Sequence, residues 1–370
     1  MAQAADYDST GVKYYKIPTF KFSDGTTLHN VQVAYRSINP SSTVGAILIP
    51  TCYGGIINTT ETWTTSPNDS LAKYHVIVVA MLGNGESASP SNKPMFPEIG
   101  QLRYQDVVNA QYALLTDHLG IKELEAVVGF SMGGQQAYHW AVMYPDYMKR
   151  IVPICSSART SPHNYAFLEG PISALTNSID YVAVQAMKEK AAQGEQIGPK
   201  LKEVKPKRGL RAFARGYGAW LTSTHWFRQQ LWGKVEGGLG FDSVESWMVA
   251  RGEGYLAWEA DDLLILARMW QQGDIGAVIP DKNSLTELGG KPSSDEQFQA
   301  ALQSIKCKAL LLPCQTDQYF PPEDSEIEVK YLRHGKCEPI PSVWGHVAGG
   351  GANPVDLAWL NERLAKFMAE

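Results

Sequence analysis

The sequence predicts an α/β fold in which helices cover both faces of a mostly parallel central sheet and a helical insertion forms a lid. Three observations lead to this prediction. Short apolar segments, such as residues 46–50 and 74–80, alternate with longer helical patterns. These segments are apolar throughout, which is typical of parallel strands buried on both faces. Between residues 161 and 304 the sequence has no such segment and several helical patterns instead.

The expected elements follow one another in a regular order. Two strands are expected at residues 14–22 and 28–35, on either side of a turn at residues 23–25. Further strands are expected at residues 46–50, 74–80, 126–128, 151–155, 309–313 and 338–343. Helical spacing of apolar residues covers residues 103–119, the segment up to Tyr144, and residues 354–368. Crossovers between the parallel strands should be right-handed.

The change of pattern after Ser156 divides the chain. We expect residues 1–160 and 305–370 to form the α/β core and residues 161–304 to form the helical lid. Helical runs are expected at residues 172–191 and 210–221, and six of the ten tryptophans lie in this region. A lid of this kind excludes water and shapes a substrate pocket.

The central motif is Gly129-Phe130-Ser131-Met132-Gly133, a G-x-S-x-G between an expected strand and an expected helix. This context is typical of a nucleophile elbow. The turn is so tight that residues two before and two after the serine need almost no side chain, and both are glycine. Ser131 would then lie at a helix N-terminus, where N–H groups favour a developing negative charge.

A serine hydroxyl is a poor nucleophile at neutral pH, so it needs a base, and the base needs an orienting carboxylate. In folds with this elbow the acid and then the histidine follow later strands. Asp317 follows the expected strand 309–313, and His346 follows the last one. The oxyanion hole needs two backbone N–H groups, which we assign to Met132 and to Tyr53 in the loop after residues 46–50. Cys52 is an alternative nucleophile, but no base follows it in the expected order.

Several blocks of the sequence resemble the homoserine O-acetyltransferase (MetX)-like family of α/β-hydrolases. They are RYQDVVNAQYALLTDHLGI, GFSMGGQQAYHWAVMYPD, SARTSPHN, ARGYGAWLT and TDQYFPPED. The resemblance covers nearly the whole chain, including the lid. It implies an α/β-hydrolase fold, a triad of Ser131, Asp317 and His346, and a homodimer formed through lid helices.

Departures from that family concern the acyl acceptor. In the acetyltransferases the residue after the catalytic histidine is an aspartate that holds the homoserine amine, but here it is Val347. A lid arginine is matched by Arg215, whereas the tyrosine seven residues later is replaced by Thr222. Arg215 could bind a substrate carboxylate or pair with a neighbouring acid. Valine cannot bind an ammonium group, so homoserine is not the expected acceptor.

Composition limits the partners, cellular location and cofactors that we expect. The chain has 370 residues and a net charge of −5 without a basic stripe, so we expect no nucleic-acid partner. The N-terminus lacks the apolar segment of a signal peptide, and no apolar run is long enough for a membrane span. Five scattered cysteines form no C-x-x-C motif, which indicates a reducing, cytoplasmic location and no metal site. No cofactor is expected.

The sequence thus favours a hydrolase that acts through an acyl-Ser131 intermediate on an ester, thioester or similar acyl bond. Its expected partner is a small, fairly apolar acyl substrate. One alternative keeps the chemistry and transfers the acyl group from acyl-CoA to an alcohol other than homoserine. A second alternative, of a different class, is a non-catalytic ligand-binding protein with a hydrolase-like fold.

Overall fold

The computed structural model describes residues 11–64, 69–194, 204–278 and 292–370. Its central element is an eight-stranded sheet with the strand order β1-β2-β4-β3-β5-β6-β7-β8. The strands are β1 (Val12–Lys21), β2 (Thr27–Ile38), β3 (Ala46–Pro50), β4 (His75–Val79), β5 (Ala126–Phe130), β6 (Arg150–Ile154), β7 (Lys308–Leu311) and β8 (Gly335–Cys337). The pairs β1–β2 and β2–β4 are antiparallel, and the remaining pairs are parallel.

Alternate residues of the central strands enter two separate cores, because successive side chains of a strand point to opposite faces. Leu48 and Val127 belong to the larger core, whereas Ile49 and Val128 belong to the smaller one. Since both faces are covered, every residue of β3 is buried. The uninterrupted apolar strands therefore reflect a sheet enclosed on both sides, as predicted.

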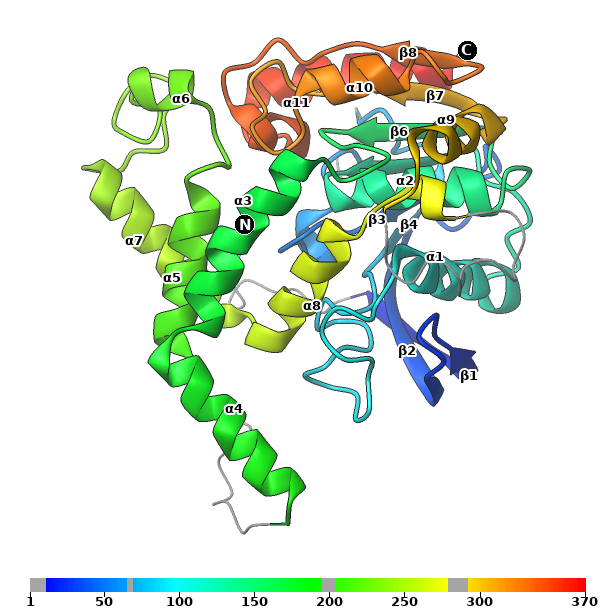
Figure 1. The fold of residues 1–370 in the computed structure, drawn as a ribbon. Helices are drawn as coiled ribbons and strands as arrows, with labels where there is room; N and C mark the ends of the chain where they lie inside the picture. Colours follow the sequence, from blue (N-terminus) through cyan, green and yellow to red (C-terminus); the bar gives the residue numbers. More distant parts are fainter. Residues whose placement is uncertain (1–10, 65–68, 195–203, 279–291) are drawn as a thin grey trace.

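Helices provide the two covers. Helices α1 (Tyr104–Ala113) and α2 (Met132–Met143) contribute to the larger core, and α11 (Pro354–Met368) contributes to the smaller core on the opposite face. α1 continues as one turn of π-helix at Leu114–His118. The short helix α10 (Pro322–Glu328) follows β7 (Figure 1).

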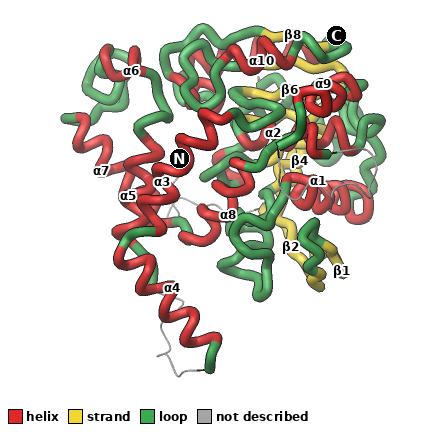
Figure 2. Tube along the Cα trace, in the orientation of Figure 1, coloured by secondary structure: helices red, strands yellow, loops and turns green. Residues whose placement is uncertain are grey.

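In the described part of the segment between β6 and β7, helices are joined by loops, and no strand is present. The segment holds α3 (Pro162–Thr176), α4 (Ile179–Ala192), α5 (Lys207–Gly218), α6 (Thr224–Arg228), α7 (Val244–Gly254), α8 (Ala260–Gln271) and α9 (Asp295–Ser304). Figures 1 and 2 show α3 to α7 gathered beside the sheet, with α4 extending away from the body. α9 instead packs against α2 of the core, so the last helix of the expected lid segment contacts the α/β layer.

Several element bounds differ from the sequence-based expectation, among them α5, which begins and ends three residues before the expected run at residues 210–221. The expected helical run at residues 172–191 is two helices, because Ser178 caps the N-terminus of α4 by accepting a hydrogen bond from the Tyr181 N–H. The last strand, expected at residues 338–343, is the short β8 at Gly335–Cys337, followed by an isolated bridge between Cys314 and Ile340. Of the helices in the described ranges, none combines the length and apolarity that a membrane span requires.

Candidate active site

Ser131 occupies a strained turn between β5 and α2. Its φ of 57° lies in the left-handed region, which is sparsely populated by residues with a side chain. The Ser131 N–H donates to the Ile154 carbonyl at 2.8 Å, and the Ser156 hydroxyl donates to the Ser131 carbonyl at 2.8 Å. Neighbouring strand β6 and the residues after it therefore hold the turn in place.

The two outer glycines of the motif are required by close backbone approach. A Cβ on Gly129 would lie 2.1 Å from the carbonyl carbon and oxygen of Gly133. A Cβ on Gly133 would lie 2.7 Å from the carbonyl oxygen of Pro50 in β3. Because backbone atoms cannot move aside as a flexible side chain can, larger residues at either position would force the turn open.

Ser131, His346 and Asp317 form a continuous hydrogen-bonded chain. The Ser131 Oγ lies 2.9 Å from His346 Nε2, and His346 Nδ1 lies 2.8 Å from Asp317 Oδ2. His346 lies in the 3₁₀ helix Gly345–Gly350 after the last strand, and Asp317 lies in the loop after β7. In the arrangement that suits both contacts, the serine hydroxyl donates to Nε2 and the Nδ1–H donates to the carboxylate.

The surroundings fix the acid and the imidazole. Asp317 Oδ1 accepts hydrogen bonds from the N–H groups of Tyr319 and Phe320, at 2.8 and 3.1 Å. The imidazole of His346 is enclosed by the rings of Phe130, Tyr319 and Phe320, with centroid distances of 4.7, 4.9 and 5.6 Å. The side chains of His346 and Asp317 are buried, so water has little access to their hydrogen bond and electrostatic interactions there are weakly screened.

A cavity of about 370 Å³ opens onto Ser131 and His346. Its wall is largely apolar and includes Trp63, Phe130, Leu221, Val347 and Ala352. Tyr53, after β3, also lines it, and the Tyr53 hydroxyl donates to the Leu263 carbonyl of α8 at 3.0 Å. Helix α8 thereby anchors the loop that bears one of the two N–H groups assigned to the oxyanion hole.

Met132 bears the other N–H group. It is the first residue of α2, directly after Ser131, and it is buried. Within the described part of the chain, neither the Met132 N–H nor the Tyr53 N–H donates a hydrogen bond. Both remain available to a ligand oxygen.

Comparisons with known proteins identify the family. A family model described as the alpha/beta hydrolase fold matches residues 45–175. The ethyl acetate hydrolase of Pseudomonas veronii is 32% identical over 330 residues, which cover 88% of this chain and 85% of that protein. The chain belongs to the α/β-hydrolase family. It is an enzyme of that class, either an ester hydrolase or an acyltransferase.

Two further likenesses place this α/β-hydrolase within the family. The structure of an acetylester hydrolase from Corynebacterium glutamicum matches with a TM-score of 0.81 and 26% identity, covering 100% of both chains. The homoserine O-acetyltransferase of Trichormus variabilis is 26% identical over 389 residues, covering 98% of this chain and 95% of that protein. This α/β-hydrolase is therefore a divergent member of the MetX-like group.

The three residues expected to bind substrate lie in different surroundings. Val347 lines the cavity beside His346. Arg215 does not: it is exposed on α5, and its Nη2 lies 3.3 Å from Glu245 Oε1, so of the two expected roles it takes the pairing with an acid. Thr222 is buried against Gly345 and is not part of the cavity wall, so it packs beneath the loop that carries His346.

Arg251 was not among the residues singled out from the sequence. It lies on α7 and lines the same cavity as Ser131. The sequence offered little signal for it, because α7 carries acidic residues as well and an arginine in a lid helix is ordinarily paired at the surface. Its position relative to Ser131 follows only from the packing of α7 against α5.

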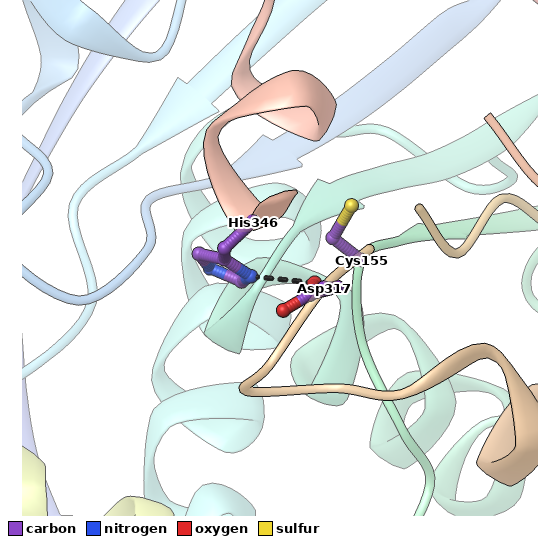
Figure 3. Close-up of side chains that lie close together, drawn as sticks. All are labelled: Cys155, Asp317 and His346. Atoms are coloured by element: carbon purple, nitrogen blue, oxygen red, sulfur yellow. Dashed lines mark hydrogen bonds and ion pairs between the residues drawn. The ribbon is translucent and has the colours of Figure 1, made fainter. Parts of the chain in front are cut away.

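Cys155 lies next to the acid–base pair (Figure 3). Its Sγ, an oxygen of Asp317 and a nitrogen of His346 lie within 4.8 Å of one another, a spacing that could hold a metal ion. Burial, reinforced by the charge of Asp317, raises the pKa of the Cys155 thiol well above its usual range. The thiol is thus kept protonated, and a protonated thiol is a weak metal ligand.

Cys52, the alternative nucleophile, also lines the cavity. Burial raises the pKa of its thiol to about 12. Since the thiolate is the reactive form of cysteine, Cys52 is a poor nucleophile at neutral pH.

Proposed function

We propose that this α/β-hydrolase is a serine esterase that hydrolyses a small acyl ester through an acyl-Ser131 intermediate. The observation that carries the proposal is the chain of short contacts from the Ser131 Oγ through His346 to Asp317, at the wall of a largely apolar cavity. The ester-hydrolysing relatives support the same chemistry.

In the first half of the reaction, the Ser131 Oγ attacks the acyl carbonyl carbon while His346 Nε2 accepts the hydroxyl proton. The Nδ1–H bond to Asp317 holds the imidazole in place and stabilises the imidazolium that forms. The negative charge on the former carbonyl oxygen is stabilised by the N–H groups of Met132 and Tyr53, each contributing roughly 3–4 kcal/mol to lowering the barrier. The imidazolium then gives its proton to the leaving alkoxide.

In the second half, a water molecule attacks the acyl carbon of the Ser131 ester while His346 accepts one of its protons. The bond between the acyl carbon and the Ser131 Oγ then breaks, and the imidazolium returns the proton to Oγ. Val347 favours water over homoserine as the acceptor, because nothing at this position can meet an ammonium group.

Transfer to an alcohol other than homoserine is the second candidate, and it is supported by the likeness to the acetyltransferase of Trichormus variabilis along almost the full chain. Incubation with acetyl-CoA, with and without alcohol acceptors, distinguishes the two candidates by their products. Release of acetate at a rate independent of the alcohol supports hydrolysis. Formation of an acetyl ester in preference to acetate supports transfer.

The nucleophile is tested with a fluorophosphonate probe, which reacts with activated serines. We expect labelling of the wild-type protein on the peptide that contains Ser131, and none in Ser131→Ala. Absence of labelling in the wild type, or equal labelling of the variant, would contradict the proposal that Ser131 is the nucleophile.

A further inference from the structure

The cavity at Ser131 is lined by a partly buried arginine, Arg251, and two of its nitrogens have no hydrogen-bond partner among the described residues. The Nε and Nη2 atoms of Arg251 are buried, and neither has a hydrogen-bond partner among the described residues. The described residues also provide no carboxylate within ion-pair distance of this guanidinium. Buried N–H groups of a cation that find no acceptor are costly, so their presence beside a cavity calls for an explanation.

Two other arginines of this region, Arg211 and Arg215, are each paired with an acid. Arg211 of α5 pairs with Glu253 of α7 at 2.7 Å, and Arg215 of α5 pairs with Glu245 of α7 at 3.3 Å. Both pairs are exposed to solvent and join α5 to α7, the helix that carries Arg251. Arg211 and Arg215 are thus each paired with an acid at the surface, whereas Arg251, which lines the cavity, has no such pair in the described structure.

Among the described residues, tyrosines lie near Arg251, and no ion pair joins Arg251 to an acid. Its Cζ lies 6.0 Å from the ring centroid of Tyr255, whose buried hydroxyl also lacks a partner. Burial raises the pKa values of Tyr217, Tyr255 and Tyr319, and the nearby positive charge of Arg251 partly opposes this effect in each. The tyrosines therefore remain neutral and leave the charge of the guanidinium uncompensated.

The cavity wall itself does not supply a negative charge either. Among the described residues that line it, Arg251 is the only one with a permanent charge, and no aspartate or glutamate is present. A guanidinium presents its N–H groups in a planar fork that matches the two oxygens of a carboxylate. The missing partner is thus best supplied by a bound molecule.

We propose that Arg251 binds a carboxylate of the substrate, so that the enzyme acts on esters that carry a negative charge within the cavity. This inference rests on the proposed ester hydrolysis at Ser131 and names the substrate class of that site. The carboxylate can belong to the acyl part, as in a half-ester of a dicarboxylic acid, or to the alcohol part, as in an acylated hydroxy acid. A carboxylate on either side of the ester would make the same contact with Arg251. The choice of substrates in the experiment distinguishes the two.

Two matched substrate pairs provide the test. Monoethyl succinate and the ethyl ester of succinamic acid differ in a carboxylate on the acyl side. Acetoxyacetate and acetoxyacetamide differ in a carboxylate on the alcohol side. For the wild type, kcat/KM for the carboxylate should exceed that for its amide by about tenfold or more in at least one pair, the loss typical of one charge-assisted contact.

Variants assign the preference to Arg251. Arg251→Met should abolish the preference, and Arg251→Lys, which keeps the charge but not the fork, should retain part of it. Arg211→Met, which removes a lid arginine paired at the surface, is the matched control and should leave the preference as in the wild type. A wild type with no preference in either pair, or a preference that survives Arg251→Met, would overturn the proposal.

Binding to a protein that cannot turn over separates this proposal from the proposed hydrolysis. In Ser131→Ala, calorimetry should show that one of the carboxylate esters binds about tenfold or more tightly than its amide, and that Ser131→Ala/Arg251→Met loses the difference. Equal affinities would overturn the carboxylate site even if the wild type is an active esterase. A clear difference would support the site even if none of the four esters is hydrolysed.

Discussion

The Oγ atom of Ser131 lies 2.9 Å from Nε2 of His346, although 215 positions separate the two residues in the chain. Ser131 follows β5 near the centre of the sheet, and His346 follows the last strand at its edge. The contact exists because the carboxyl ends of parallel strands meet at one edge of a sheet, where their loops converge. Asp317, after β7, completes the same constellation.

Replacing Asp317 by asparagine should lower kcat by about 10³–10⁴-fold. The asparagine oxygen can still accept from the N–H groups of Tyr319 and Phe320, so the loop should keep its shape. Its NH₂ group, however, would face Nδ1 and favour the tautomer with the proton on Nε2, which cannot accept the Ser131 proton. Steady-state kinetics with p-nitrophenyl acetate measure the effect. The control is Asp324→Asn, because Asp324 lies nearby but takes no part in the hydrogen bonds between Ser131, His346 and Asp317. A comparable loss of kcat in this control would count against the role of Asp317.

Gly129→Ala should destabilise the protein by about 3 kcal/mol or more, because the new Cβ would lie 2.1 Å from backbone atoms of Gly133. Gly170→Ala is the matched control. Gly170 lies on the exposed face of α3 with no atom near the added Cβ, so alanine should stabilise by up to about 1 kcal/mol. Denaturant unfolding measures both variants. A Gly129→Ala protein of wild-type stability would contradict the tight elbow.

Stability should depend on pH through Glu328. Burial raises the pKa of this carboxyl from 4.5 to about 8, although the Tyr138 hydroxyl and the Ala158 N–H both donate to it at 2.6 Å. Between these two values the folded state holds a proton that the unfolded state has released. The contribution of Glu328 is therefore complete below the unfolded value and is lost as the pH rises through the folded one.

Glu328→Gln replaces the titratable carboxyl by an amide and should weaken the dependence of stability on pH. Relative to the variant, the wild type should lose up to about 1.4 kcal/mol of unfolding free energy per pH unit within that range. Urea unfolding at a series of pH values gives the difference. Glu326→Gln, on the exposed side of the same helix, controls for the loss of a surface charge. Parallel curves for wild type and Glu328→Gln would show that the carboxyl is not protonated in the fold.

Homoserine should be a poor acyl acceptor. The residue after His346 is Val347, which lines the cavity, and no acid lines it within the described residues. The ammonium group of an amino-acid acceptor would remain unpaired. The preference of the enzyme for such an acceptor should therefore be reduced by ~10²-fold or more. We expect no saturable formation of O-acetylhomoserine from acetyl-CoA and homoserine. Efficient formation of O-acetylhomoserine, with a saturable dependence on homoserine, would contradict this prediction and show that the chain is a homoserine acetyltransferase.

Much of the site could be predicted from the sequence, because its residues follow strands that the sequence marks clearly. The apolar segments before Ser131 and Asp317 and the G-x-S-x-G motif fix the order of elements, and topology then brings the loops together. His346 lies in this chain of contacts, as expected from its place after the last strand, although that strand begins three residues before the expected start. Its position depends on the loop after the sheet rather than on the exact end of β8.

The lid was less predictable, since helix periodicity does not determine which side of a helix faces the cavity. Arg215 and Arg251 both lie on lid helices, yet only Arg251 lines the cavity, because the packing of α5 against α7 leaves Arg215 beside Glu245 at the surface. Thr222 is similar: its neighbour in space is Gly345, more than a hundred positions away in the chain. Such contacts depend on tertiary packing that no local pattern encodes.

Trapping the covalent intermediate tests the central claim most directly. The protein is mixed rapidly with p-nitrophenyl acetate, quenched in acid, digested, and analysed by mass spectrometry. We predict one acetyl group on the peptide that contains Ser131, formed during a burst of p-nitrophenol, with neither seen in Ser131→Ala. Acetylation at another residue, or turnover by Ser131→Ala within about tenfold of the wild type, would contradict the account.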